Sequence, residues 1–334
     1  MKTNAAPQPA ALTELTIIVC TYHRETMLAG TLASIAAQRP TDSLDVRVLV
    51  VDNSDEGTAL GVVERSLRAS PFRMQWAPAH PANIAIARNV GVELAATEYI
   101  AFVDDDNALK PGWLEAVAKA LGAHPHDVFF GAYDAAFERP ERATRATRQV
   151  FSRRLDAASG SDLFAMGRRQ TRHIALGTNN TIIRRAALPS NCAPFDISFG
   201  HGGGEDYDLF CRMQRAGHRF GWLPEAQCHE FVTAARCEPS YLRRRFFVGG
   251  QTFAAGASRA SAHPRLKRWW LRVKALMQAL SMSAAFPAIA LRGRAARLDH
   301  IYRLAGVWGK LSFGEIYPIY RRTAGASGQS GSQI

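Results

Sequence analysis

Apolar residues in the first 140 positions follow two alternating patterns. Continuous apolar runs, typical of buried strands, occur at residues 15–20, 45–52, 74–77, 99–107 and 127–137. Between them, apolar residues recur every three or four positions, which predicts helices at 27–35, 62–67, 83–96 and 109–121, the last with Pro111 in its first turn. Strands and helices that alternate in this way predict an α/β fold, with a mostly parallel sheet flanked by helices.

Polar residues follow three of these strands, at 21–24, 52–55 and 104–106. Ligands of parallel α/β sheets bind at the carboxyl ends of the strands. Hydrophilic turns would explain one such end, but three together predict a binding site. A GxGxxG fingerprint after the first strand and a GxxxxGK[ST] motif are both absent from the sequence, so the dinucleotide and P-loop interpretations lose their main support.

The acidic triplet Asp104-Asp105-Asp106 is the most informative of these strand ends. Adjacent carboxylates repel one another unless exposure or a cation relieves the repulsion. Alternate residues of an extended chain share a face, so Asp104 and Asp106 should act together and apart from Asp105. Carboxylate oxygens suit Mn²⁺ or Mg²⁺, which would bridge the protein to a diphosphate. A solvated acidic turn is the alternative interpretation.

A second acidic motif follows three glycines, at residues 202–208 (GGGEDYD). Glycines allow unusual backbone angles and close approach of a ligand. Glu205 and Asp206 fall at a predicted helix start, where a carboxylate could serve as general base for a hydroxyl nucleophile. Acids in a first helical turn are also common as plain complements of the helix dipole.

The charge balance indicates a negatively charged partner. The 334 residues carry 41 Lys and Arg against 29 Asp and Glu, a formal net charge of +12. This excess lies mainly between residues 236 and 297, and it suits phosphorylated ligands, anionic lipid or nucleic acid. We expect no nucleic-acid partner, because the carboxylates at the strand ends would repel phosphates in the absence of a metal. A metal-dependent nucleotidyltransferase remains an alternative.

The five cysteines lack the paired spacing of a disulfide framework or a zinc finger, which favours a reducing compartment. A zinc site at Cys228, His229 and Cys237 is disfavoured for the same reason. The N-terminus lacks the apolar core of a signal peptide, so we do not expect export.

The C-terminal part combines basic residues with an apolar stretch. The segment after Lys274 is barely long enough for a membrane span and contains Gln278 and Pro287, while the Trp269-Trp270 pair precedes it. We interpret it as a peripheral membrane patch, with a helical bundle on the catalytic domain or a true span as alternatives. The predicted organisation is a disordered arm at 1–13, a catalytic domain at 14–255, a basic, amphipathic, membrane-associating helical region at 256–322 and a disordered tail at 323–334.

Eight ordered motifs resemble a known family. They are TIIVCTYHR, VVDNS, PANIAIARNVG, YIAFVDDDNALKPGWLE, GTNNTIIRR, FGHGGGEDYDLFCRMQRAG, PEAQCHEFVTAAR and YLRRRFFVGGQTF. Over residues 14–255 the chain resembles the inverting family 2 glycosyltransferases of GT-A fold, especially the succinoglycan-type glucosyltransferases of exopolysaccharide assembly.

The resemblance implies roles for individual residues. Thr21, Tyr22 and Asp52 would contact the nucleotide base, although Asp52 could instead cap a turn. Asp206 would be the catalytic base, and Glu205 would orient the acceptor or support Asp206. The remaining implied donor contacts are Arg24, Arg88 at the diphosphate, Asp104 at the ribose, Asp105, and Asn179 near the donor sugar.

The metal would be held by Asp106 and by a downstream residue, either His229 or Glu230, with His229 favoured. The implied reaction is a single displacement that moves a hexose from a nucleoside-diphosphate sugar, expected to be UDP-linked, onto a lipid-linked saccharide with inversion. The resemblance places this reaction at the cytoplasmic face of the cell membrane.

Overall fold

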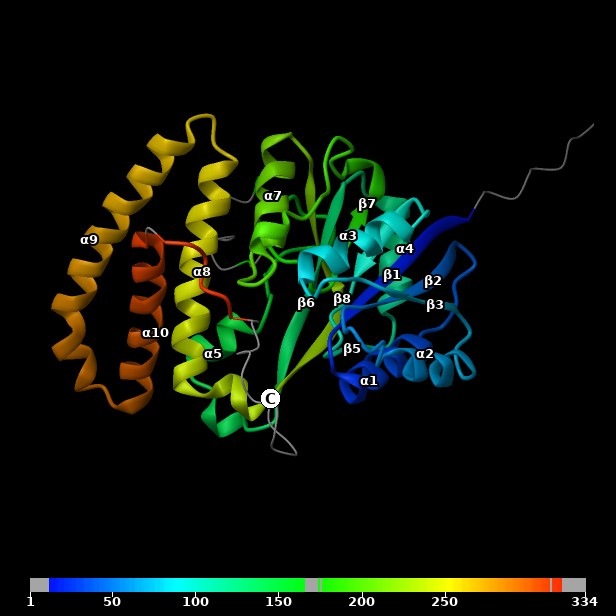
Figure 1. Cartoon of the computed structure of the whole chain (residues 1–334), viewed down its shortest axis with the longest axis horizontal. Coiled ribbons are helices and arrows are strands. Elements are labelled where there is room, and N and C mark those ends of the chain that lie inside the picture. The colour runs from blue at the N-terminus through cyan, green and yellow to red at the C-terminus, as the bar shows by residue number, and fades with distance from the viewer. Residues whose placement is uncertain (1–11, 166–173, 175, 313, 320–334) are drawn as a thin grey trace, which may run out of the picture.

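A single eight-stranded sheet forms the centre of the molecule, in the order β3-β2-β1-β4-β7-β6-β8-β5 (Figure 1). The computed structural model describes residues 12–165, 174, 176–312 and 314–319. The strands are β1 Thr13–Thr21, β2 Leu44–Asp52, β3 Arg73–Pro78, β4 Tyr99–Phe102, β5 Asn107–Leu109, β6 Val128–Phe137, β7 Thr181–Arg184 and β8 Phe220–Val232. The first four in the sheet order run parallel, β7 lies antiparallel between β4 and β6, β6 and β8 are parallel, and β5 closes the edge antiparallel to β8.

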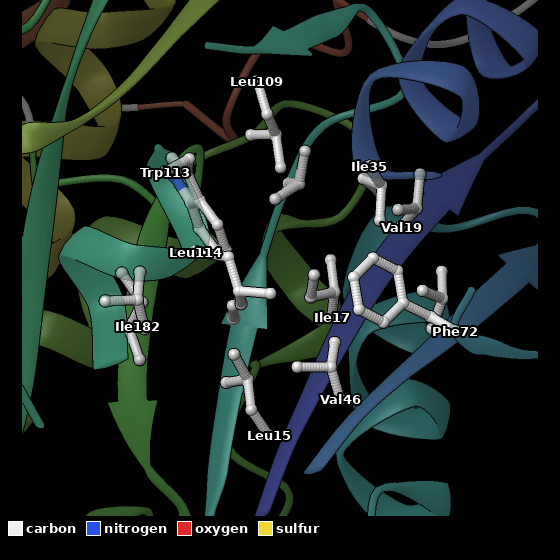
Figure 2. Close-up of a cluster of buried hydrophobic side chains, with 14 of the residues drawn as sticks. Leu15, Ile17, Val19, Ile35, Val46, Phe72, Leu109, Trp113, Leu114 and Ile182 are labelled. Atoms are coloured by element: carbon white, nitrogen blue, oxygen red, sulfur yellow. The ribbon is translucent and has the colours of Figure 1, made fainter. Parts of the chain in front are cut away.

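The strand β1 shows how the sheet acquires two cores. Successive side chains of a strand point to opposite faces. Ile17 therefore packs with the helices on one face, while Ile18 packs with those on the other. Figure 2 shows part of the first cluster, where Leu15, Ile17 and Val19 of β1 lie among side chains of neighbouring strands and helices. Burying each large apolar side chain contributes about 1.5–3 kcal/mol.

Helices flank both faces of this sheet. They are α1 Glu25–Ala36, α2 Leu60–Leu67, α3 Ile84–Leu94, α4 Trp113–Ala123, α5 Arg145–Val150 and α7 Glu205–Arg215, with short 3-10 helices at Pro140–Arg142, Arg185–Ala187, Ile197–Phe199 and Ala234–Cys237. The side chain of Asn83 caps α3 by accepting hydrogen bonds from the amides of Ala85 and Ile86. The predicted alternation of strands and helices is confirmed.

Two local predictions were wrong. The apolar run at 99–107 is not one strand, because β4 ends at Phe102 and the three aspartates occupy a turn before β5. Pro111 lies outside α4, since the helix starts at Trp113 and Gly112 is its N-cap with φ +84°. A turn ends β4 earlier than the apolar pattern indicates, and a turn at Gly112 makes α4 begin later.

Three long helices follow the sheet: α8 Pro239–Arg259, α9 Pro264–Ala290 and α10 Arg294–Leu311. Each of the three packs against the other two, and α8 also packs against α7 (Figure 1). The predicted helical C-terminal extension is therefore present, but the predicted boundary at 255/256 falls inside α8. The predicted arm and tail lie outside the described residues, except that position 12 is described and Thr13 already belongs to β1.

The helix α9 lies at the outer edge of the molecule, on the side away from the sheet (Figure 1). By length and composition it could cross a membrane: it has 27 residues, and an 18-residue window within it has a mean hydropathy of 1.3. Only 11% of that window is buried in the protein. Its exposed large apolar side chains are Leu266, Trp269, Trp270, Leu276, Met277 and Leu280.

Candidate active site

The polar ends of β1, β2 and β4 meet because these strands are parallel neighbours. Thr21 donates a hydrogen bond to the carboxylate of Asp105, with Oγ1 and Oδ2 2.8 Å apart. Arg24 donates from one nitrogen to both Asp105, at 2.9 Å, and Asp106, at 3.1 Å. Residues separated by some 80 positions thus form one charged cluster at this edge of the sheet.

The acidic triplet does not divide as the extended-chain argument predicts. Asp105 and Asp106 are both buried and share Arg24, whereas Asp104 is half-exposed and faces Arg88, whose Nη2 lies 3.8 Å from its Oδ1. The expected pairing of Asp104 with Asp106 was wrong because a turn, not a strand, carries the three residues. Burial raises the pKa of Asp105 to about 6, although the Arg24 guanidinium opposes the shift.

Asp52 and Tyr22 differ sharply in their exposure. Asp52 is fully buried, and its carboxylate accepts hydrogen bonds from the Ser54 amide at 3.0 Å, the Ser54 hydroxyl at 2.7 Å and the Ala59 amide at 2.8 Å. These are the contacts of a turn-capping residue. Tyr22 is 37% exposed and meets the ring of His23 edge-on, with centroids 4.4 Å apart, so a face of Tyr22 remains available to a ligand.

Arg88 joins the first acidic motif to the second. It projects from α3, is buried, and pairs with Glu205 at the start of α7 while it also faces Asp104. Burial raises the pKa of Glu205 to about 7, against the opposing effect of Arg88. One guanidinium therefore connects the strand-end carboxylates to the helix that carries Asp206.

Asp206 lies in the first turn of α7 and is half-buried. Its Oδ1 accepts from the Tyr207 amide at 2.6 Å, and its Oδ2 faces the loop before β7: a Cβ added to Gly177 would lie 3.1 Å from that oxygen. The helix start depends on Gly204, whose φ is +97° and where an added Cβ would lie 2.4 Å from the Cβ of Thr252 in α8. Glycine is required there by both backbone angle and space.

A third group extends the site to β8. Arg236 donates to Asp106 Oδ2 at 2.9 Å and to Glu230 Oε1 at 2.8 Å. Asn179 donates to the other Glu230 oxygen at 3.4 Å and contacts Asn107. His229 is exposed and, as the neighbour of Glu230 in a strand, points to the opposite face. The sequence favoured His229 over Glu230 as the companion of Asp106, but Glu230 is the residue that lies with Asp106, because its side chain points to the buried face of β8.

Sequence reasoning missed two arginines of this region. Arg236 gave no signal beyond its place at the end of the motif PEAQCHEFVTAAR. Arg153 is fully buried and donates to the carbonyl oxygens of Gly177 at 2.8 Å and Asn180 at 3.2 Å. It thereby holds the loop that faces Asp206, and a buried arginine cannot be recognised from the surrounding sequence.

The described ranges contain no group of three or more His, Cys, Asp or Glu arranged to hold a metal ion. One observation nevertheless fits an added cation. Asp106 Oδ2 accepts from two arginines, while its Oδ1 is buried and has no hydrogen-bond partner among the described residues. A buried carboxylate oxygen without a donor suits a hard cation whose other ligands come from a diphosphate.

Comparison with known proteins places the chain among sugar-transferring enzymes. The sequence profile of glycosyl transferase family 2 matches residues 16–188. The chain is 31% identical over 315 residues to the succinoglycan biosynthesis protein ExoM of Rhizobium meliloti (strain 1021), which covers 92% of this chain and 96% of that protein. It is 29% identical over 145 residues to the validoxylamine A glucosyltransferase of Streptomyces hygroscopicus subsp. limoneus, covering 41% of this chain and 32% of that protein.

Solved structures share the fold at lower identity. The mannosyltransferase PcManGT from Pyrobaculum calidifontis, in complex with GDP-Man and Mn²⁺, matches with a TM-score of 0.56 and 20% identity, covering 92% of this chain and 90% of that one. Residues 1–349 of S. aureus TarS, in complex with UDP, match with a TM-score of 0.53 and 18% identity, covering 90% and 89%. The predicted GT-A fold is confirmed.

Proposed function

This chain belongs to glycosyltransferase family 2, and from that premise we propose that it transfers a hexose from a UDP-linked donor, with inversion, onto a lipid-linked saccharide in exopolysaccharide synthesis. The observation that carries the proposal is the ion-pair chain Asp104–Arg88–Glu205. It joins the strand ends, where ligands of such sheets bind, to the helix start that carries a half-exposed carboxylate. A donor and an acceptor site would therefore meet at Asp206.

The donor half would use the strand ends. The available face of Tyr22 would stack on the base, with Thr21 and the loop shaped by Asp52 beside it. Asp104, half-exposed, is free to accept from the ribose, and Asp105 is held in place by Thr21 and Arg24. UDP as the carrier rests on the family resemblance, while the bound UDP of TarS and the bound GDP-Man of PcManGT belong to those proteins.

The leaving diphosphate would meet positive charge. Three arginines form ion pairs with carboxylates of this cluster, so their guanidinium groups are already fixed near the strand ends: Arg24, Arg88 and Arg236. Fixed charges stabilise a developing anion without reorganisation during the reaction. Mn²⁺ or Mg²⁺, held by Asp106 with Glu230 nearby in preference to His229, would add neutralising charge there. Asn179, which contacts Asn107 and Glu230, would face the donor sugar.

The chemical step is a single displacement. Asp206 accepts the proton of the acceptor hydroxyl as that oxygen bonds to the anomeric carbon, and the bond from that carbon to the diphosphate oxygen breaks on the opposite face. Attack from the opposite face inverts the configuration. Glu205 does not share the proton transfer, because Arg88 holds it buried, and its role is to fix the start of α7 and so orient Asp206.

The acceptor class and the location are supported by α9. Exposed Trp269, Trp270 and Met277 form an apolar outer face, and basic residues cluster around the tryptophan pair. Interfacial helices combine these features, and each basic residue near an anionic surface contributes about 1 kcal/mol. α9 also packs on α10 through Ala275 and Ala279, as expected of a bundle. We place the enzyme on the cytoplasmic face of the cell membrane, attached peripherally, in line with the succinoglycan role of its relative.

Release of nucleoside diphosphate from a panel of nucleotide sugars, with Mn²⁺ or Mg²⁺, tests the proposal. We expect metal-dependent hydrolysis of one donor, abolished in Asp106→Ala and retained in the control Glu64→Gln on the exposed side of α2. Asp206→Asn should still bind the donor but lose transfer when membrane extract supplies acceptors. Absence of donor binding and turnover by the wild type would refute the transferase, and release of pyrophosphate from a nucleoside triphosphate would favour the nucleotidyltransferase instead.

A further inference from the structure

An open cavity of about 790 Å³ lies between α8, α9 and α10, outside the site described above, and its lining residues Ser281 and Ala285 are exposed to solvent. Most of its wall area is apolar, from Phe246 and Phe253 of α8, Met282 and Ile289 of α9, and Val307 of α10, and the basic side chains Arg245, His300 and Arg303 also line it. A second cavity of about 580 Å³ adjoins it and shares Phe253 with it. Volumes of this order are typical of sites that hold small molecules.

Lys310 brings a positive charge to both cavities. It lies in the last turn of α10, lines both cavities, and holds its ammonium 5.4 Å from the ring centroid of Phe253. Burial lowers the pKa of Lys310, and within the described part of the chain no carboxylate pairs with it. An ammonium beside an aromatic ring, in a cavity that arginines also line and without an acidic partner, suits an anionic group supplied by a ligand.

The cavity wall is in contact with the catalytic helix. The ring of Phe253 lies 5.7 Å from that of Tyr207, which directly follows Asp206. The two helices also approach closely at Gly256, where an added Cβ would lie 2.9 Å from the Tyr207 ring. A ligand against Phe253 would therefore be linked, through Tyr207, to the helical turn that carries Asp206.

We propose that this cavity binds the hydrocarbon chain of the lipid-linked acceptor, with the lipid phosphate at Lys310. The inference rests on the proposed function for the identity of the acceptor. The outer face of α9 carries exposed large apolar side chains, and other α9 residues line the cavity, so one helix would meet both a membrane and the bound lipid chain. The contact of Phe253 with Tyr207 then brings the saccharide end of the acceptor toward Asp206.

Binding of dodecyl phosphate to the full chain, measured by isothermal titration calorimetry below its micellar concentration, tests this site. Ala285→Trp and Ser281→Phe fill the cavity from α9, and Lys310→Met removes the charge. Ala288→Trp is the matched control, because Ala288 is exposed on the same helix and does not line the cavity. We expect at least tenfold weaker binding in each of the first three variants and no change in the control.

Two results would overturn the proposal. Dodecyl phosphate that binds Ala285→Trp and Ser281→Phe as tightly as the wild type would show that it does not enter the cavity. Inorganic phosphate that binds as tightly as dodecyl phosphate would show a site for free phosphate rather than for a lipid. Thermal unfolding followed by circular dichroism identifies any variant that fails to fold. Donor hydrolysis by the wild type is measured separately, so failure of the transferase proposal is distinguishable from failure of this site.

Discussion

The pairing of Arg88 with Glu205 should dominate the stability of the active-site region. Both side chains are buried, and the carboxylate has Arg88 as its cation. Replacing Arg88 by methionine keeps the apolar stem and removes the charge, which leaves Glu205 ionised or forces it to bind a proton. Removing one member of a buried pair costs about 3–5 kcal/mol, because the other charge remains without compensation.

The complementary change should cost less. In Glu205→Gln, Arg88 keeps a second carboxylate, since Asp104 lies 3.8 Å from its Nη2. At pH 7.5 we expect a loss of less than about 1 kcal/mol, because the weakened hydrogen bond is offset by removing a carboxylate whose raised pKa makes its ionised form unfavourable in the folded chain. The double variant Arg88→Met/Glu205→Gln leaves no buried charge without a partner at this point. It should therefore be more stable than the sum of the single losses by about 2 kcal/mol.

Urea unfolding at pH 7.5, followed by tryptophan fluorescence and circular dichroism, measures the four free energies of this cycle. Arg47→Met is the control, because Arg47 pairs with Glu14 on the surface, where the two side chains are 35% and 42% exposed. An exposed pair of this kind contributes about 0–1 kcal/mol. The reasoning is refuted if Arg88→Met destabilises no more than Arg47→Met, or if the two losses in the cycle simply add.

Three further predictions concern the site and its supports. Arg236→Gln should raise the affinity of the chain for Mn²⁺ about tenfold, measured by electron paramagnetic resonance, because a positive charge on Asp106 is removed. Gly204→Ala should lower the free energy of unfolding by about 2–4 kcal/mol, because backbone strain at φ +97° and a steric contact with α8 add together. Gly217→Ala is its control: Gly217 has φ +92° and open space around it, so this variant should lose only the strain energy of about 1 kcal/mol. The pKa of Glu205 is about 7 in the folded chain and 4.5 in the ordinary case. Between these pH values the folded chain binds one more proton than the unfolded chain, so the stability falls as the pH rises through this window. Between pH 5 and pH 8, the free energy of unfolding measured in urea should fall by about 2–3 kcal/mol less in Glu205→Gln than in the wild type.

Each of these predictions has a contrary result. Weaker Mn²⁺ binding in Arg236→Gln would mean that the arginine organises the carboxylates more than it competes with the cation. Equal losses in Gly204→Ala and Gly217→Ala would exclude the contact with α8. An identical pH dependence in Glu205→Gln and the wild type would show that this carboxyl does not titrate in the window.

The strand ends were predictable from sequence because a continuous apolar run that stops at a polar residue marks both the strand and its end. The predicted end of β2 at Asp52 is the observed end. Parallel neighbours then bring such ends together without further information. The acidic triplet was less predictable, since the apolar pattern does not show that β4 stops at Phe102 and that the aspartates turn.

The partners of the carboxylates were beyond sequence reasoning. Arg236 lies 130 positions after Asp106, and Arg153 is buried among carbonyl groups of loops that come later in the chain. A charged side chain carries no periodic signal of its own, so its contacts depend on which elements pack together. The choice between His229 and Glu230 shows the same limit, because it required knowing which side chains of β8 point toward Asp106.

Local patterns therefore determined the α/β class, the order of the elements and the acidic motifs, because each depends on residues within a few positions of one another. The tertiary structure decided which guanidinium meets which carboxylate, that Arg88 connects the two acidic motifs, and that α8 packs between α7 and a cavity formed with the C-terminal helices. Arg24 and Asp105 are separated by 81 positions, and Arg88 and Glu205 by 117. Only the packing of the whole chain brings such segments within hydrogen-bond or van der Waals distance.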